Sequence, residues 1–575
     1  LAVRFEALHA VTHFRQDPTY NRDGRVFGAV KYDPAWLAER GMKSSLRVNY
    51  ERGDIDANRP RTIPPGDRIT PWFMTGTTTA PNGTVYRNFN QNVYDWRYYN
   101  SYRAAIPNTG ANVAGSPNFN PYLGPILLFG GSYAFFTDPN SSVSPDMLYV
   151  PQSLFTEHKG IGPTGAVDGN VRGLLQGNRW GHIANNVEIA QRLGLPFAAA
   201  YKNNVITDAS IFDFYNKLID GPNKNEARAF DAYNIAWSQS FLKDRVGYEL
   251  VYDRQRYQDS SWALNIPGRG ETAGYITINI DTVMPDQTPN PNVGRPMIVT
   301  RSEFGADGSE TDRETVRLTA YAELRADDFL KKSWLTKILG RHVFTGAYTD
   351  DSYEREISVW STYGLSDNGN GLLRSNNLLP DRGLQIVSYL GPDLRGVSSA
   401  SGLNLSAITA PQTISSSMLL RGFDSTWNRP TNPTAPGYVN PAAPWVNPYN
   451  NGNLTQAENP ANYVGWVDRP VTVLDSREGN NRDLLTRVAN KGLNEVTSKV
   501  LVWQGYLFDG VVVPMFGYRK DEAENYAVTA PVHPVGGYAD RQSADYTFSD
   551  TPNDTVSGTS KSYGLVVHTP KRLLH

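Results

Sequence analysis

Short segments with a strand-like alternation are separated by connections that are by turns very short and very long. The clearest segment spans residues 316–325, where Val316, Leu318 and Leu324 share one face and Arg317 and Glu323 lie on the other. An apolar residue at every second position is the period of a β-strand. A single strand of this kind also fits an ordinary antiparallel sheet with one solvated face. The lengths of the connections therefore decide between fold classes.

Ten segments follow the same period of two, and we predict a strand for each. Two of the predicted connections are tight turns, at Leu242-Lys243-Asp244 and at Asp509-Gly510, the second being a strong hairpin signal. The predicted strands occupy residues 1–14, 25–33, 43–52, 230–240, 246–253, 316–325, 344–348, 497–508, 511–522 and 559–569.

The long and short connections alternate along the chain. The long ones span about 53–229, 259–313, 361–495 and 527–558, and short ones lie between them. A soluble sandwich has no reason to enlarge every second connection, whereas a membrane barrel has short periplasmic turns and long extracellular loops. The sequence therefore predicts an all-β fold: an antiparallel transmembrane β-barrel with very long extracellular loops, of which about ten strands are visible.

Composition narrows the class further. The 575 residues are 39% hydrophobic and 19% charged, with 50 Gly, 38 Pro and 32 Tyr, a mixture that favours strands and turns. No run approaches the roughly 20 apolar residues of a membrane helix, so a membrane location requires a closed barrel. The net charge of −2 argues against nucleic-acid binding, and the absence of cysteine excludes disulfides and thiolate metal sites.

Five stretches resemble TonB-dependent outer-membrane receptors, particularly the large ones of environmental bacteria. They are Gln16–Pro34, Asn58–Phe73, Ile206–Lys224, Pro285–Pro296 and the predicted hairpin Val500–Tyr526. The resemblance implies an outer-membrane receptor that binds a nutrient (siderophore, cobalamin, glycan or peptide) and imports it with energy from the TonB complex. It also implies contact with outer-membrane lipid.

The same resemblance implies a barrel of 22 strands, filled by an N-terminal plug that engages TonB. About ten strands are visible by their period, no plug sequence precedes Leu1, and the chain does not end in a strand with a terminal aromatic residue. We therefore expect residues 1–575 to be a partial receptor-like barrel whose plug and terminal strands are missing. The plug that would contact TonB is then not part of this chain.

Motifs for catalysis or metal binding are weak. Residues 160–165 match G-x-G-x-x-G, but Pro163 and further glycines follow where a dinucleotide site needs a helix, so we predict a loop. His9 and His13 share a strand face but lie ~13 Å apart, too far for one metal ion. Asp367–Gly371 lacks the carboxylate spacing of a calcium loop, so we predict a turn there. We expect no enzyme activity, no metal and no cofactor.

Two further features lie in the long connections. The apolar spacing after Asp208 predicts a capped amphipathic helix that reaches Ile219. Aromatic side chains also gather beside arginines, and flat aromatic faces next to cations suit ligands such as glycans or metal chelates. The alternative is that such long connections need small cores of their own. The candidate ligand-binding residues are Trp96, Arg97, Tyr98, Tyr99, Trp427, Trp445, Tyr449 and Trp466.

Two other functional classes remain open at this point. A passive porin-type channel needs only the barrel and a constricting loop, without a plug. A surface or secreted β-protein that binds polysaccharide would be soluble without detergent. The sequence does not identify the ligand, because siderophore, cobalamin, oligosaccharide and peptide uptake share one architecture.

Overall fold

A computed structural model provides the structure of the chain. It describes residues 1–38, 40–83, 85–93, 95, 97, 127–129, 136–137, 147–149, 160–168, 172–173, 181–183, 186–202, 204–264, 274–302, 305–366, 382–449 and 453–569.

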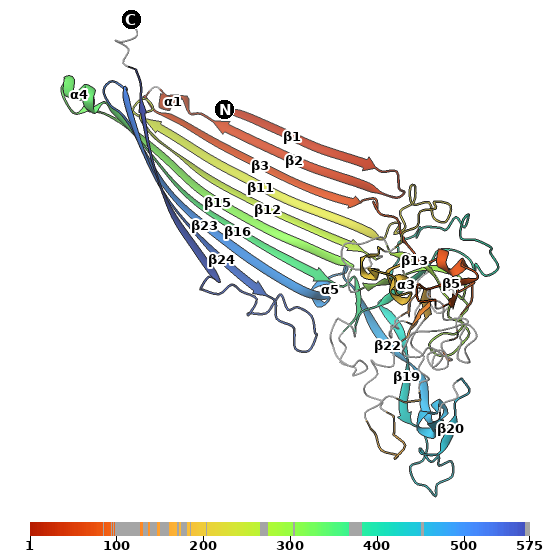
Figure 1. Cartoon of the computed structure of the whole chain (residues 1–575). Coiled ribbons are helices and arrows are strands. Elements are labelled where there is room, and N and C mark those ends of the chain that lie inside the picture. Colours follow the sequence, from red (N-terminus) through yellow and green to blue (C-terminus); the bar gives the residue numbers. More distant parts are fainter. Residues whose placement is uncertain are drawn as a thin grey trace.

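Ten long strands form one antiparallel sheet in which each strand pairs with the next of these strands along the chain (Figure 1). The strands are β1 (Ala2–His13), β2 (Tyr20–Tyr32), β3 (Lys43–Asn58), β11 (Lys224–Phe241), β12 (Val246–Ala263), β15 (Ala306–Arg325), β16 (Arg341–Trp360), β23 (Thr486–Tyr506), β24 (Val512–Thr529) and β25 (Asp554–Val567). They correspond one to one to the ten predicted strands. The prediction of an all-β fold built on a large antiparallel sheet is confirmed.

Several strands are longer than their hydrophobic pattern indicated. β3 continues to Asn58 instead of ending near residue 52, and β15 begins at Ala306 instead of residue 316. In the extension of β3, Asp54 and Asp56 lie on the face that carries the apolar residues of the preceding segment, and Ile55 and Ala57 lie on the opposite face, so the apolar residues change face. The backbone pairing nevertheless continues without a break through residue 57, because it depends on main-chain groups and not on side-chain polarity.

The connections at the two ends of the sheet differ in size, as Figure 1 shows. At one end lie the connection with α1 (Ala35–Ala38), the tight turn 242–245, the connection with α4 (Trp334–Leu339) and the turn 508–511. The last of these is wider than the predicted two-residue turn: Leu507 bridges Val512, and Phe508 and Asp509 both have positive φ. The connections 59–223, 264–305, 361–485 and 530–553 lie at the opposite end.

The three longest connections share small sheets and form one packed unit, which we call the connection module (residues 59–223, 264–305 and 361–485). One five-stranded sheet draws on all three connections: β4 (Gly66–Asp67), β13 (Tyr275–Ile278), β14 (Pro296–Arg301), β18 (Gln385–Tyr389) and β8 (Phe136–Thr137). A four-stranded sheet joins two of them: β17 (Tyr363–Leu365), β22 (Tyr463–Asp475), β19 (Ser417–Trp427) and β9 (Met147–Tyr149).

The connection module has hydrophobic cores of its own. The largest includes Trp72, Phe89 and Phe212 from the first connection, Ile298 from the second and Leu390 from the third. A second core lies where the module meets the sheet, with Trp262 and Trp360 from the ends of β12 and β16. The described part of the module is therefore a folded body joined firmly to the sheet.

The remaining elements are short. The helices are α3 (Asn186–Arg192), α5 (Asn481–Leu484) and the 3-10 turns η1 (Thr70–Phe73), η4 (Ala198–Ala200), η6 (Ala326–Asp328), η7 (Gln456–Glu458) and η8 (Pro460–Asn462). The other strands are β5 (Thr77–Thr79), β6 (Val85–Arg87), β7 (Leu127–Phe129), β10 (Gly181–Ile183), β20 (Pro444–Val446) and β21 (Asn453–Thr455). Among the described residues, every helix is too short or too polar to cross a membrane.

The predicted helix from Asp208 to Ile219 is wrong. The segment is a series of turns, and the main chain on either side of Lys217 pairs with Asp17: Asp17 N–H donates to the carbonyl of Asn216 at 2.8 Å, and Leu218 N–H donates to the carbonyl of Asp17 at 3.0 Å. These bonds to the β1–β2 connection take the place of helical bonds. The apolar residues of the segment instead enter the largest core, where Phe212 is 1% exposed.

Candidate functional site

The register of the ten strands sorts their side chains onto two faces of opposite character. One face carries exposed apolar side chains across the strands, in the half of the sheet nearer the short turns; we call this the apolar band. Its exposed members include Val3, Phe5, Val26, Val30, Leu46, Tyr50, Ile235, Trp237, Leu250, Leu318, Leu324, Phe344, Tyr348, Leu501, Tyr563 and Leu565. Large exposed apolar patches mark surfaces that contact another apolar phase or a partner.

The apolar band has the height of a membrane interior. On β15 it runs from Val316 to Leu324, eight steps of about 3.3 Å, or roughly 26 Å along the strand. Aromatic pairs lie within it, such as Tyr233 with Tyr252 at 5.8 Å and Trp237 with Tyr248 at 5.3 Å between ring centroids. Outer-membrane barrels carry an apolar band about 25 Å tall that is flanked by aromatic girdles.

On β3, β12, β15 and β16 the opposite face is polar and is crossed by ion pairs. Glu249 accepts from Arg47 at 2.8 Å and from Arg317 at 3.3 Å, which joins three strands. Glu323 pairs with Arg325 at 2.6 Å and with Arg341 at 3.1 Å. This face has the character of the hydrated lumen wall of a barrel.

Lys499 is a charged residue that does not lie on the polar face. It lies opposite Tyr348 and Lys520 in the sheet, on the same face as the apolar band. It marks the side of the band that is nearer the connection module. On that side a row of charges crosses β3, β11, β12 and β15 in register, consisting of Arg52, Asp231, Arg256 and Asp312.

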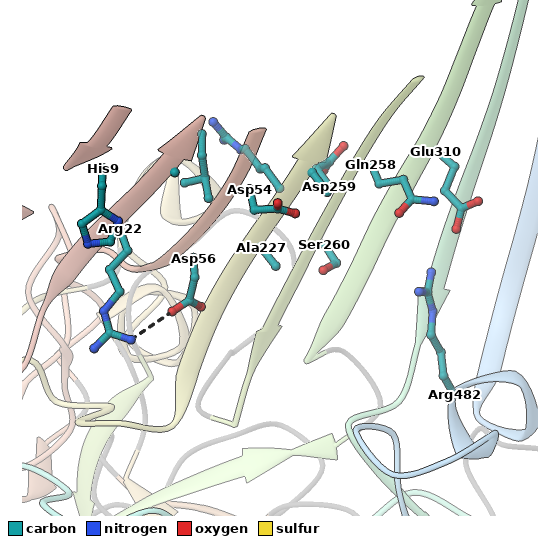
Figure 2. A pocket seen from close by; sticks show the side chains of 14 residues that line it. His9, Arg22, Asp54, Asp56, Ala227, Gln258, Asp259, Ser260, Glu310 and Arg482 are labelled. Atoms are coloured by element: carbon teal, nitrogen blue, oxygen red, sulfur yellow. Dashed lines mark ion pairs between the residues drawn. The ribbon is translucent and has the colours of Figure 1, made fainter. Parts of the chain in front are cut away.

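Beyond this row of charges lies a groove of about 450 Å³, which Figure 2 shows from close by. It follows two register rows across the strands, on the same face as the apolar band. The first row contains His9, Gly24, Asp54, Ala229, Gln258 and Glu310, and the second contains Arg22, Asp56, Ala227 and Ser260. The groove is hollow because small residues occupy the middle of both rows, while longer polar side chains stand at its ends.

The groove carries both signs of charge. Arg22 and Asp56 lie 3.7 Å apart at one end. At the other end, the Arg482 guanidinium stacks on the Trp360 ring at 4.0 Å and donates to Ser358 Oγ at 3.2 Å. Burial, together with the neighbouring Arg541, lowers the pKa of Arg482. The sequence did not single out these residues, because they lie apart in the chain and only strand register aligns them.

Two of the candidate aromatic residues belong to the largest core of the connection module. Trp445 and Tyr449 are partly buried and pack against that core. Arg97 joins them: its guanidinium lies 4.5 Å from the centre of the Tyr449 ring, and Nη1 donates to the Tyr449 hydroxyl at 3.0 Å. Asp95 holds Arg97 through two oxygens at 2.7 and 2.9 Å. The structure thus brings together Arg97 from the first long connection with Trp445 and Tyr449 from the third.

Trp427 and Trp466 belong to a different aromatic group. Trp427 contacts Tyr463 edge-on at 5.3 Å, and Trp466 contacts Phe423 edge-on at 5.8 Å. Phe423 and Tyr463 are buried, so both tryptophans cover a small core. Trp96, Tyr98 and Tyr99 lie outside the described residues. A ligand-binding role for the candidate aromatic residues stays a prediction.

The 160–165 motif lies in a turn. In this turn Gly162 N–H donates to the Ala166 carbonyl at 2.8 Å, and a bridged turn follows it rather than a helix. In the described ranges, no three His, Asp or Glu side chains gather closely enough to hold a metal ion. Asp367–Gly371 lies outside those ranges.

Comparison with known proteins adds three distant structural matches. No protein-family model and no curated protein matches the chain. The ferric preacinetobactin receptor BauA of Acinetobacter baumannii aligns with a TM-score of 0.30 at 6% identity, over 99% of this chain and 41% of that one. The ferric-catecholate import receptor Fiu of E. coli K12 aligns with a TM-score of 0.30 at 7% identity, over 99% and 48%. The siderophore receptor PiuA of Acinetobacter baumannii aligns with a TM-score of 0.29 at 9% identity, over 98% and 42%.

The chain spans less than half the length of each of these receptors. At such TM-scores the matches carry no argument about this chain. Its functional interpretation rests on its own two-faced sheet and on the folded connection module.

Proposed function

We propose that this chain forms part of the barrel wall and the outer, ligand-facing region of an outer-membrane nutrient receptor. The observation that carries this proposal is the apolar band, an exposed apolar surface that crosses the sheet and is backed by a polar, ion-paired face. Lipid in contact with this band would remove its apolar side chains from water. The other face would then line a hydrated lumen.

The placement of the connections supports the orientation of the sheet. The short turns would face the periplasm, and the connection module would lie outside the cell, where nutrients arrive. The row of charges and the groove beyond the apolar band would then lie at the level of the outer lipid headgroups. β1 and β25 each leave one backbone edge unpaired within the described sheet, and because lipid does not hydrogen-bond to such an edge, we propose that further strands complete the wall.

The second part of the proposal is that import is energised. The resemblance of five sequence stretches to TonB-dependent receptors supports it, as does the size of the connection module. We propose that the module binds a nutrient such as a siderophore, cobalamin, glycan or peptide, and that a plug outside this chain couples the barrel to the TonB complex. The protein is proposed to perform no covalent chemistry.

Membrane extraction tests the location. The protein expressed in a Gram-negative host is expected to stay in the outer-membrane fraction after an alkaline carbonate wash and to dissolve only in detergent. The reason is that the apolar band is stabilised by lipid at about 25 cal/mol per Å² of buried apolar surface. Recovery in the aqueous fraction would contradict the membrane proposal and favour the secreted polysaccharide-binding protein.

Uptake assays separate an energised receptor from a passive channel. Cells that express the full-length protein would be offered a labelled ferric catecholate, cobalamin and a maltooligosaccharide in turn. Uptake of the accepted compound is expected to stop when a protonophore collapses the inner-membrane gradient. Uptake that continues unchanged would instead support a porin-type channel.

Replacement of Arg97 tests the proposed ligand contact in the module. An Arg97→Ala variant loses a cation that is already oriented by Asp95 and Tyr449, and we expect about 3- to 30-fold weaker binding of the accepted compound, on the scale of one cation–π contact. Isothermal titration of the purified receptor measures this change.

Arg395→Ala is the matched control. Asp393 lies two residues before Arg395, as Asp95 lies two residues before Arg97, and Arg395 Nη2 donates to Asp393 Oδ2 at 2.6 Å. Unlike Arg97, Arg395 has no aromatic partner among the described residues. Equal losses of affinity in the two variants would contradict a specific role for Arg97.

A further inference from the structure

The connection between β15 and β16, Ala326–Gly340, exposes a dense group of apolar side chains at the short-turn end of the sheet. Phe329 is 74% exposed and Trp334 is 69% exposed, while Leu330, Leu335 and Leu339 are exposed by 43–48%. We call this stretch the turn segment. The same end of the sheet also has the four-residue turn 242–245, so a hairpin connection there does not require such a length.

The turn segment is held in a fixed position. Ala326 N–H donates to the Gly340 carbonyl at 2.9 Å and closes its base. Phe508 N–H and Asp509 N–H, from the neighbouring turn, donate to the carbonyls of Ile338 and Lys337 at 3.3 and 3.2 Å. An ion pair between Arg245 and Asp328 ties it to a third hairpin. The apolar side chains are therefore presented by a braced structure.

The two sides of the turn segment have opposite polarity. Its polar side, with Lys332, Ser333, Thr336 and Lys337, lines a cavity of about 650 Å³ together with Arg325, Arg341 and Tyr506 from the polar face of the sheet. Trp334, Leu335, Ile338 and Leu339 share the other side of α4, at the spacing of one helical face, and none of them lines the cavity. The turn segment thus continues the two-sided character of the sheet beyond the strand ends, where Figure 1 places α4.

The charge of the turn segment also points to its partner. The segment contains Lys331, Lys332 and Lys337, and its two acidic residues, Asp327 and Asp328, lie at its start, where Asp328 pairs with Arg245. None of these three lysines forms an ion pair with another residue that the structure describes. Tryptophan and phenylalanine next to lysine are characteristic of segments that lie at a lipid headgroup layer, with the cations near the phosphates.

We propose that the turn segment is an interfacial anchor that binds anionic phospholipid on the short-turn side of the membrane. Phe329, Trp334 and Leu335 enter the boundary between headgroups and acyl chains, and Lys331, which does not line the cavity, contacts phosphate oxygens. The inference rests on the proposed membrane location of the sheet, and it assigns to this connection a role that barrel closure does not require.

Site-specific labels test the anchor, since the chain contains no cysteine of its own. Single substitutions Leu335→Cys, Leu318→Cys and Val446→Cys would carry an environment-sensitive fluorophore in the full protein, reconstituted in phosphatidylethanolamine–phosphatidylglycerol vesicles. Leu318 lies in the apolar band, and Val446 is 82% exposed in the connection module. Quenching by lipids brominated near the headgroup or near the chain ends, and by aqueous iodide on both sides, reports the depth of each label.

We expect the Leu318 label to be quenched by lipid brominated near the chain ends and the Leu335 label by lipid brominated near the headgroup. The Val446 label should respond only to iodide. If the Leu318 label is buried in lipid but the Leu335 label is as accessible to iodide as the Val446 label, the anchor is wrong and the membrane location stands. If the Leu318 label is itself open to iodide, the proposed function fails. A Leu335 label shielded from both quenchers would show that protein covers the segment, which overturns lipid as the partner.

Charge reversal provides a second measurement. Lys331→Glu is expected to reduce headgroup quenching of the Leu335 label several-fold in vesicles with phosphatidylglycerol. Lys332→Glu makes the same change of charge at the next residue, which lines the cavity on the polar side, and serves as the control. Equal reductions in the two variants would overturn the role of Lys331.

Discussion

A Leu318→Arg substitution is expected to lower the free energy of unfolding from a lipid bilayer by about 2–4 kcal/mol, the cost of an arginine near the middle of a barrel's lipid face. Leu318 is 41% exposed and lies between Leu250 and Tyr348 on the neighbouring strands. A guanidinium at this position would have to remain in hydrocarbon or pull water into it. Equilibrium unfolding by urea in vesicles measures the change.

Thr319→Arg is the matched control for this prediction. Thr319 is the next residue on the same strand, so it faces the opposite side, and it lies directly across from Glu249. An arginine there meets a carboxylate on the polar face, and the free energy of unfolding should change by less than about 1 kcal/mol. Similar destabilisation by the two substitutions would contradict the assignment of one face to lipid and the other to the lumen.

A Trp72→Ala substitution is expected to destabilise the connection module by about 3–5 kcal/mol, which is typical when a large aromatic side chain is removed from a core. Trp72 is completely buried, contacts Phe73 edge-on at 5.1 Å and donates from its indole to the Asn92 carbonyl at 3.1 Å. Loss of its ring leaves both a cavity and an unpaired carbonyl. Proteolysis of the reconstituted protein should cut the module at much lower protease concentration, while the embedded strands remain protected.

Trp36→Ala removes the same side chain from a different environment. Trp36 is 55% exposed in the β2–β3 connection, far along the sheet from the module. Surface substitutions of this kind usually change stability by less than about 0.5 kcal/mol, and the module of this variant should resist protease as the unmodified protein does. Equal sensitivity in the two tryptophan variants would show that Trp72 does not stabilise the module through its core.

The strands could be predicted from sequence because a sheet with one apolar face gives each strand a period of two. The dependence on this period also explains why the predicted strand 43–52 ended before β3 does. From Arg52 to Asn58 the polar residues of β3 lie on the face that is apolar earlier in the strand, so the hydrophobic pattern no longer continues in phase although the ladder continues. Lys499 shows that polarity alone does not assign a face, because beyond the apolar band the face that carries the band is polar as well.

The connection module and the groove depend on contacts that a single sequence does not reveal. β4 pairs with β13 across about two hundred residues, and β9 pairs with β19 across a longer interval. The groove brings Gly24, Ala229 and Ala227 into two adjacent register rows on either side of Asp54 and Asp56, which requires the register of three strands. The segment after Asp208 has the apolar spacing of a helix, but it does not form one because its main chain pairs with Asp17.

The shared sheets of the connection module have a mechanical consequence. The first, second and third connections each contribute strands to the same five-stranded sheet, so backbone hydrogen bonds join them into one unit. One connection is unable to swing away alone without breaking backbone ladders to the other two. An opening movement on this side of the molecule must therefore displace the module as one body, and it must also disturb the core in which Trp262 and Trp360 join the module to the long strands.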